Sequence, residues 1–173
     1  MSVPKAEIAR TKDLKEDLIS EIHHWLMESF INENDTTVWS SVDWHILLWV
    51  GNQLVSHAEI VEREISVRGE KVLVGGIGGV VTRPQWRHRG LASTAMEVAQ
   101  SYICGELNLE FGLLMCDETV VSFYEKLGWE VVKSLLVFDQ PTGKVAFEDT
   151  VMVYGCGSKI WPDGRIDVQG PPW

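Results

Sequence analysis

Lys71–Ser93 reads KVLVGGIGGVVTRPQWRHRGLAS, and this stretch decides the fold. Its first half, Val72 to Thr82, is apolar, β-branched and rich in glycine, which predicts a buried strand. A basic turn follows, and a helical pattern then runs from Leu91 to about Gly105. The first turn of a helix has backbone N–H groups without partners and a partial positive charge. The order of strand, turn and helix therefore predicts a site for a phosphate or pyrophosphate, formed by Arg87, His88, Arg89, Gly90, Leu91 and Ala92.

Glycines interrupt the predicted strand at positions 75, 76, 78 and 79. Glycine lowers strand propensity, so this cluster indicates a bulge or the close approach of a ligand. A dinucleotide-binding fingerprint is excluded, because Val81 stands where the third glycine of that fingerprint should be.

The rest of the chain alternates short strand and helix patterns. Strands are predicted within 1–10 and over 45–50, 53–67, 72–82, 109–116, 129–139 and 150–154, and helices follow Thr11 up to Phe30, start at Leu91 and cover 119–126. The turn at 140–143 would join the last two strands. This order predicts an α/β fold with a mixed, mostly antiparallel sheet of roughly six to seven strands. Its centre would be a parallel βαβ unit made by 72–82, the helix from Leu91 and 109–116.

Length and composition favour one domain over 1–173. The apolar content is 45% and the charged content 23%, as in soluble globular proteins. No apolar run is long enough for a membrane span, and MSVPKAEIARTKD lacks the apolar core of a signal peptide. These observations predict a cytoplasmic protein.

The net charge indicates which partners the protein can bind, and the cysteines indicate its redox state. The formal net charge of −10 argues against nucleic acid and anionic membranes and favours a cationic small molecule. Cys104, Cys116 and Cys156 are scattered and odd in number, which predicts reduced thiols without a disulfide framework or metal-ligand spacing. His23 and His24 are adjacent, so they cannot form a metal-binding pair on one helix face. No metal site is expected.

The C-terminal segment 155–173, GCGSKIWPDGRIDVQGPPW, contains glycines and prolines that prevent long regular structure. It also contains Trp161, Ile166, Val168 and Trp173, which are unusual in disordered tails. We therefore expect this tail to pack on the domain.

The spacing Arg87-x-x-Gly90-x-Ala92 resembles the signature of the Gcn5-related N-acetyltransferase (GNAT) family. The run Phe123 to Trp129, FYEKLGW, resembles the second motif of that family. The resemblance implies the GNAT fold, a splayed sheet in which the turn holds the pyrophosphate of acetyl-CoA. It also implies that the backbone of Val80, Val81 and Thr82 pairs with the pantetheine arm, and that an N–H near Val80 stabilises the reaction oxyanion. The competing interpretation, a glycine turn in an unrelated α/β domain, leaves the second motif unexplained.

Tyr124 is the candidate general acid that the family resemblance implies, because members carry a tyrosine there that protonates the leaving thiolate. A phenol is protonated at neutral pH and can donate. The alternative is an aromatic side chain that only supports the cofactor by packing.

A looser resemblance extends over most of the chain to the aminoglycoside 2'-N-acetyltransferases. It rests on Leu47-Leu48-Trp49, Ser56-His57-Ala58, the Arg83 to Arg87 segment, and a tail ending in tryptophan. It implies that polycationic sugars are bound by acids and by the terminal carboxylate of Trp173, which would also serve catalysis. The substrate-binding candidates are Glu33, Asp35, Asp117, Asp167 and Trp173.

The sequence differs from those enzymes at the residue that acts as their general base. They carry a glutamate on the glycine-rich strand, where this chain has Gly78. Water with the Trp173 carboxylate, or Asp117 or Glu118, could replace it, or the substrate could differ. The segment Trp161 to Gly164 is also similar to nodulation-factor N-acyltransferases.

The sequence thus predicts an acetyl-CoA-dependent N-acetyltransferase for an aminoglycoside, at its 2'-amine, which would confer antibiotic resistance. Family habit adds the expectation of a homodimer. The alternatives are a GNAT enzyme for another amine, such as an amino sugar, metabolite or peptide, and a non-catalytic acyl-CoA-binding module, which Gly78 favours.

Overall fold

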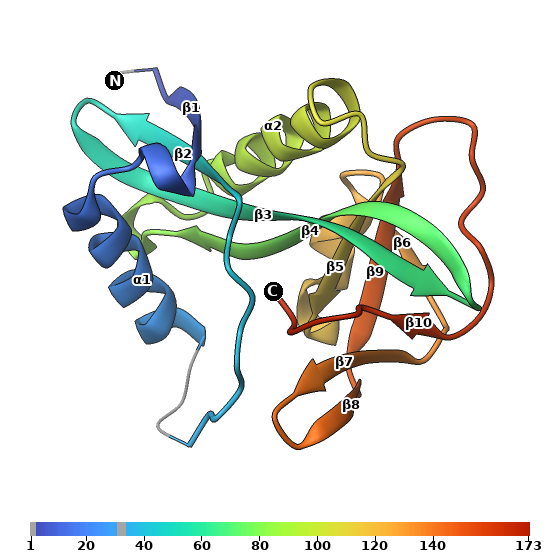
Figure 1. The fold of residues 1–173 in the computed structure, drawn as a ribbon. Helices are drawn as coiled ribbons and strands as arrows, with labels where there is room; N and C mark the ends of the chain where they lie inside the picture. Colours follow the sequence, from blue (N-terminus) through green and yellow to red (C-terminus); the bar gives the residue numbers. More distant parts are fainter. Residues whose placement is uncertain (1–2, 31–33) are drawn as a thin grey trace.

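The computed structural model describes residues 3–30 and 34–173, which form a curled mixed sheet with helices packed against it (Figure 1). In these ranges the sheet has ten strands. Eight follow the order β6-β9-β5-β4-β3-β10-β7-β8, and β2 joins β1 to β3 off this path. The strands are β1 (Lys5–Arg10), β2 (Trp44–Val50), β3 (Gln53–Val67), β4 (Glu70–Thr82), β5 (Phe111–Cys116), β6 (Glu130–Val132), β7 (Leu136–Gln140), β8 (Gly143–Phe147), β9 (Thr150–Gly155) and β10 (Ile166–Asp167). The helices are α1 (Glu16–Phe30), α2 (Leu91–Gly105) and α3 (Val121–Glu125), with short 3-10 turns η1 (Thr11–Asp13), η2 (Pro84–Trp86) and η3 (Glu118–Val120).

The predicted central unit is confirmed. Strands β4 and β5 are parallel neighbours, α2 connects them, and the other partners of these two strands, β3 and β9, run antiparallel. The mixed α/β fold class is therefore the one expected from the stretch around the glycine-rich strand.

Helices α1 and α2 pack on opposite faces of the sheet (Figure 1). Side chains alternate between faces along a strand, so neighbouring residues of β2 serve different helices. Leu47 packs in one buried cluster with Trp25 of α1. Leu48 packs in another with Met96 of α2. The apolar run in β2 is buried for this reason on both of its faces.

The sheet has more strands than expected. The predicted strand 129–139 divides into β6, which pairs with β9, and β7, which pairs with β8 and β10. The turn at 140–143 closes the β7–β8 hairpin rather than leading to β9. Gly143, at φ 113°, provides the left-handed backbone that this tight connection requires.

The expectation that the cysteines are all reduced is wrong. Cys104 near the end of α2 and Cys156 just after β9 form a disulfide across 52 positions of sequence. Their closeness depends on β9 lying beside β5, and the N–H of Cys156 donates to the carbonyl of Glu110 at 3.1 Å. Cysteine spacing alone cannot reveal this pairing, and it no longer supports a cytoplasmic location, which stays a prediction.

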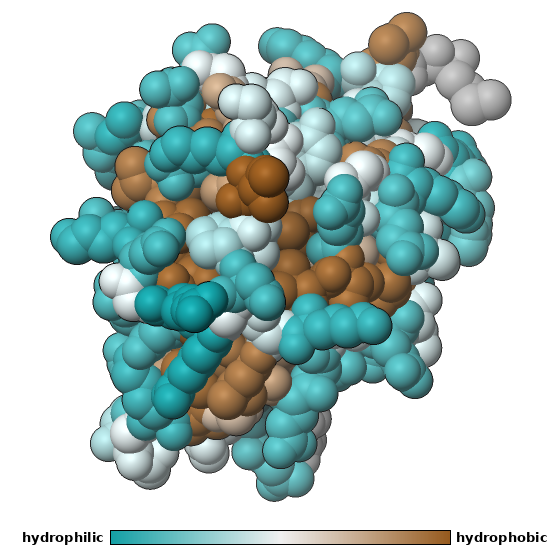
Figure 2. Space-filling model, turned by 90° about the vertical axis from the view of Figure 1, so that its right-hand side faces the viewer, coloured by the Kyte–Doolittle hydropathy of each residue, from teal (hydrophilic) through white to brown (hydrophobic). Residues whose placement is uncertain are grey.

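The tail 155–173 lies against the strands. Trp161 packs edge-on against Phe111, with 5.1 Å between ring centroids, and Ile166 is fully buried in β10 between β3 and β7. Figure 2 shows the side of the molecule that carries the loop between β9 and β10, where hydrophobic residues form patches separated by hydrophilic ones. Among the described helices, none has the length and apolar character needed to cross a membrane.

Candidate active site

The two central strands separate at one end of the sheet. Pairing between β4 and β5 runs from Val74 with Phe111 to Ile77 with Leu114. Beyond that point the residues of β4 pair with β3, and those of β5 pair with β9. Because no ladder joins the strands there, backbone groups of β4 become available to an extended ligand.

A cleft of about 450 Å³ lies between this end of β4, the start of α2 and the end of α1. It is lined by Ser29, Phe30, Val80, Val81, Thr82, Trp86, Arg87, His88, Gly90, Leu91, Ala92, Ser93 and Phe123. All the cofactor-binding candidates from the sequence therefore meet here except Arg89. The guanidinium of Arg89 instead lies over the Trp86 ring, 5.0 Å from its centroid. Sequence reasoning did not assign Ser29, Phe30, Trp86, Ser93 and Phe123 to the cofactor site, although Phe123 begins the second motif.

The turn before α2 has the backbone of an anion site. His88 (φ 59°) and Gly90 (φ 76°) are both left-handed, and Gly90 is the residue that caps the helix. A side chain at position 90 would meet nothing within 4 Å, so the backbone faces open space. The unpaired N–H groups at the start of α2 can therefore reach a diphosphate, and these residues fit the one in acetyl-CoA.

Tyr124 lies on α3 next to the cleft but is 8% exposed. Its ring packs edge-on against Phe123, the side chain that lines the cleft. Burial raises the pKa of Tyr124 above its ordinary value, so its hydroxyl stays protonated. A role as general acid remains a prediction, because a buried ring can equally support its neighbours.

Glu59 lies opposite Gly78, the position at which the resembling enzymes carry a glutamate. The register of the sheet sets Glu59 of β3 directly opposite Gly78 of β4, next to a bulge in β3. A Cβ at position 78 would lie 3.8 Å from Glu59 Oε2, an ordinary contact, and 3.0 Å from the backbone carbonyl carbon of Trp173. The glycine thus leaves room for Trp173 and stands beside the Glu59 carboxyl group, which the sequence did not single out as a base. The available signal was a glutamate inside the apolar run Leu54 to Ile60.

Burial raises the pKa of Glu59 from 4.5 to about 7. A Cβ at position 79 would come within 2.7 Å of this carboxyl group, so Gly79 is needed to seat it. A carboxylate with a pKa near neutral can take a proton from an amine at physiological pH. The arrangement therefore offers a candidate general base on β3, opposite Gly78, which stands two residues before Val80.

A family model described as an acetyltransferase (GNAT) domain matches residues 10–132. The chain belongs to the GNAT acetyltransferase family. It is 27% identical over 131 residues to the aminoglycoside 2'-N-acetyltransferase of Mycolicibacterium fortuitum. That match covers 72% of this chain but 64% of the relative, so the chain spans less than two thirds of that protein.

Solved structures share the GNAT fold. Escherichia coli ElaA superposes with a TM-score of 0.64 at 16% identity, covering 87% of this chain and 99% of ElaA. An acyl-CoA N-acyltransferase from Pseudomonas aeruginosa gives 0.63 at 17% identity, covering 88% and 100%. Escherichia coli YhbS, a GNAT protein crystallised with CoA, gives 0.61 at 12% identity, covering 96% and 89%.

The predicted substrate acids of this GNAT protein do not gather around the cleft. Asp35 accepts the N–H of Thr37 at 2.9 Å, and Asp117 accepts that of Thr119 at 2.8 Å. Hydrogen bonds from the side chains of Thr37 and Thr119, and then these backbone bonds, lower the pKa of the two carboxyls. Glu33 lies outside the described residues.

Asp167 is tied elsewhere, since its carboxylate binds Lys144 Nζ at 2.6 Å and accepts the N–H of Gln169 at 2.9 Å. Asp167 pairs with Ser66, which is seven residues along β3 from Glu59, roughly 20 Å at the usual rise of a strand. Asp167 is thus held apart from the proposed base.

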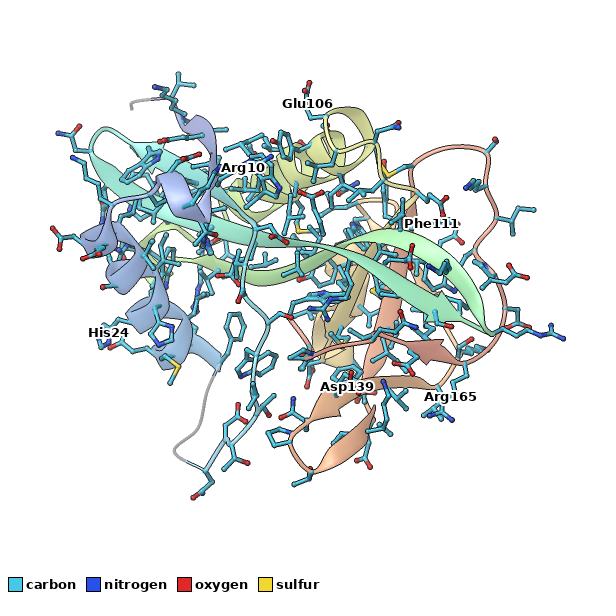
Figure 3. The ribbon with its side chains drawn as sticks, in the orientation of Figure 1. Arg10, His24, Glu106, Phe111, Asp139 and Arg165 are labelled. Carbon is cyan, nitrogen blue, oxygen red and sulfur yellow. A yellow bond between two sulfur atoms is a disulfide. The ribbon has the colours of Figure 1, made fainter. Side chains whose placement is uncertain are left out.

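The C-terminal segment of this GNAT protein is held in place by residues far away in sequence. Arg63 donates to the carbonyl of Pro171 at 2.6 Å, and Ser40 N–H donates to that of Pro172 at 2.8 Å. Asp139 lies next to this segment, where its N–H donates to Gly170 at 2.8 Å (Figure 3). The Trp173 indole covers Gly76, where a Cβ would come within 2.0 Å of the ring. The glycine cluster thus admits Trp173 and Glu59, parts of the protein itself.

Proposed function

We propose that this GNAT protein is an acetyl-CoA-dependent N-acetyltransferase that acetylates the 2'-amine of an aminoglycoside. Such an activity would inactivate the drug and confer resistance. One observation carries the proposal: the carboxyl group of Glu59, with a raised pKa, and the backbone carbonyl carbon of Trp173 both lie within 4 Å of the Cβ position of Gly78, two residues before the cleft-lining Val80. Where the chain ends at Trp173, that carbon belongs to a second acidic group. Two acidic groups at one point suit an amine that belongs to a polycation. The likeness to the Mycolicibacterium fortuitum enzyme supports the same substrate class.

Each residue has a defined task in this proposal. The N–H groups around Gly90 bind the diphosphate of acetyl-CoA, which supplies the acetyl group as a thioester. Glu59 removes a proton from the substrate ammonium, so that the neutral amine can attack. The N–H near Val80 stabilises the oxyanion, and Tyr124 donates a proton to the leaving sulfur. Where the chain ends at Trp173, its carboxylate orients a second ammonium group.

The test measures CoA release with kanamycin and gentamicin as acceptors. We expect saturable, sugar-dependent release, and acetylated drug should be seen by mass spectrometry. Glu59→Gln should lower kcat/KM by about 100-fold, the scale of a lost general base. Glu64→Gln is the matched control, because Glu64 lies on the same strand, is exposed and pairs with Lys71 at 2.8 Å. Failure of every aminoglycoside to release CoA would refute the proposed substrate.

A second candidate is an N-acetyltransferase for a smaller amine. It is favoured by Asp35, Asp117 and Asp167, whose carboxylates bind groups of the protein instead of facing the cleft. A substrate with one or two amines would need fewer acids than a polycationic sugar. Glucosamine and spermidine, assayed beside kanamycin, separate the two candidates by their relative kcat/KM.

A further inference from the structure

Two buried histidines lie beside the proposed base. His45 of β2 is 4% exposed and His57 of β3 is fully buried. Their ring nitrogens and the Glu59 carboxylate all lie within 4.8 Å of one another. Two polar rings in a core need partners, and the partners of this pair form a continuous chain.

This hydrogen-bonded series, which runs from the carbonyl of Val42 to the carbonyl of Gly79, has four contacts. Thr11 Oγ1 lies 2.5 Å from the carbonyl of Val42 and 3.1 Å from His45 Nε2. His45 Nδ1 lies 2.9 Å from His57 Nε2, and His57 Nδ1 lies 3.0 Å from the carbonyl of Gly79. Carbonyl oxygens stand at both ends, and they can only accept.

The chain is one proton short. Each contact needs one hydrogen, whereas the Thr11 hydroxyl and two neutral imidazoles together carry three for four contacts. One position is therefore unfilled for every choice of tautomers. The pair can take up a single positive charge and complete its own hydrogen bonds by doing so.

The spacing of the rings favours a proton over a metal ion in that position. Two nitrogens bound to one tetrahedral zinc lie about 3.4 Å apart. The observed 2.9 Å is the length of an ordinary hydrogen bond. Burial lowers the pKa of His45 to about 4 and that of His57 to about 3, so transfer of a proton from Glu59, whose pKa is about 7, is uphill and the charged pair is a short-lived state.

We propose that the His45–His57 pair is a proton relay, which accepts the proton that Glu59 removes from the substrate amine and passes it toward Thr11. The proposal rests on the function proposed above. The ammonium loses one proton to Glu59, the carboxylic acid gives that proton to the pair, and the Thr11 end releases one proton to solvent. Bonds to hydrogen alone change: Glu59 returns to a carboxylate, and the unfilled hydrogen position moves from the Gly79 end of the pair to the Thr11 end. The tautomers of both rings must therefore shift back before the pair accepts another proton.

The relay gives Glu59 a way to release its proton while the substrate is still bound. Glu59 is only partly accessible, and in the proposed function the substrate amine binds at its carboxyl group. Thr11 lies on the far side of the pair and is half-buried, so it offers a separate way out. The base can then be reset before the product leaves.

The test uses variants that keep packing but cannot carry a proton. His57→Asn retains a donor near Gly79, and His45→Gln retains a polar atom near Thr11. We expect kcat to fall about tenfold with an unchanged KM, because proton release from Glu59 becomes slow. Concentrated imidazole buffer should restore kcat in both variants, whereas the wild-type rate should not depend on buffer. The solvent isotope effect on kcat should rise in parallel.

Matched substitutions at the end of the chain add a second test. Thr11→Val removes the hydroxyl without changing the shape of the side chain, and Thr11→Ser retains it. The first should reproduce the buffer-dependent loss of kcat, and the second should not. Gln100→Leu removes a buried polar side chain from the other face of the sheet and shows how much a loss of stability alone changes these readouts.

The outcomes separate the relay from the general base. If Glu59→Gln is inactive while His57→Asn behaves like wild type, the relay is refuted and the base stands. If the histidine variants lose activity without rescue by buffer, the pair is structural and the relay is refuted too. One zinc per chain in the purified protein would also overturn it, because the metal would occupy the nitrogens that face each other. A fully active Glu59→Gln would refute the general base on which the relay depends.

Discussion

Single residues in this protein couple chemistry to stability, and Glu59 shows how. Burial raises the pKa of its carboxyl group from 4.5 in the unfolded chain to about 7 in the folded protein. The folded state therefore binds more protons than the unfolded state between these values. By linkage, this group makes the protein less stable as the pH rises through that window. A base tuned to neutral pH is thus obtained at the expense of stability above pH 7.

Glu59→Gln should therefore be inactive yet more stable at high pH. At pH 8 we expect the free energy of unfolding to exceed that of wild type by about 3 kcal/mol, and at pH 4 the two should agree. Urea unfolding at a series of pH values measures the difference. Identical curves at pH 4 and pH 8 would show that the carboxyl group has an ordinary pKa.

Tyr124→Phe removes one oxygen and leaves the buried ring. If Tyr124 is the acid, kcat should fall roughly 100-fold while the affinity for acetyl-CoA is kept, since Phe123 lines the cleft and is unchanged. Steady-state kinetics with equilibrium binding of CoA separates these quantities. An unaltered kcat would remove Tyr124 from the mechanism and leave the ring as packing.

At the scale of elements, the splay of β4 and β5 positions the site. Its backbone groups become free only where the ladder from Ile77 to Leu114 ends. The long antiparallel ladder between β3 and β4 then fixes which side chain stands opposite Gly78. Because one residue of slip would turn Glu59 to the other face of the sheet, the bulge beside it is part of the site.

The disulfide ties α2, whose start forms the anion site, to the end of β9. Cys104→Ser should lower the free energy of unfolding by about 2 to 4 kcal/mol, because the bond closes a loop of 52 positions in the unfolded chain. Chemical denaturation with and without reductant measures this loss, and reductant should not change the variant further. Cys116→Ser is the control, since Cys116 is free. Equal stability of both variants would show that the bond is not formed.

At the scale of the whole molecule, the C-terminal tail links segments that are far apart in the sequence. Arg63 and Pro171 are 108 positions apart in sequence but share a hydrogen bond, and Arg63 also lies 5.3 Å from the Trp173 ring centroid. The expected homodimer, like the exclusion of nucleic acid and membrane as partners, stays a prediction.

Deleting Trp173 should raise the KM for the aminoglycoside about tenfold, because a carboxyl group beside Gly78 is lost. The KM for acetyl-CoA should change little, since the turn at Gly90 is untouched. Trp173→Phe keeps the backbone carboxyl and serves as the control. Equal sugar KM values for the deletion and for wild type would place the tail outside the substrate site.

The sequence by itself determined the βαβ unit, the anion-binding turn and the GNAT motifs. These are local patterns, in which strand, turn and helix propensities act over about ten to thirty residues. They predicted the cleft-lining residues within 80–82 and 87–92, with the single exception of Arg89, and the binding of acetyl-CoA there stays a prediction.

Tertiary structure alone decided the rest. Glu59 meets Gly78 through strand register, Cys104 meets Cys156 through the order of strands, and Trp173 reaches Gly76 through a tail held by Arg63. Each depends on contacts between segments distant in sequence, where loop closure and the packing of a whole sheet choose the partner. The glycine that stands in place of a base in the sequence is therefore paired with the candidate base, Glu59, on the neighbouring strand.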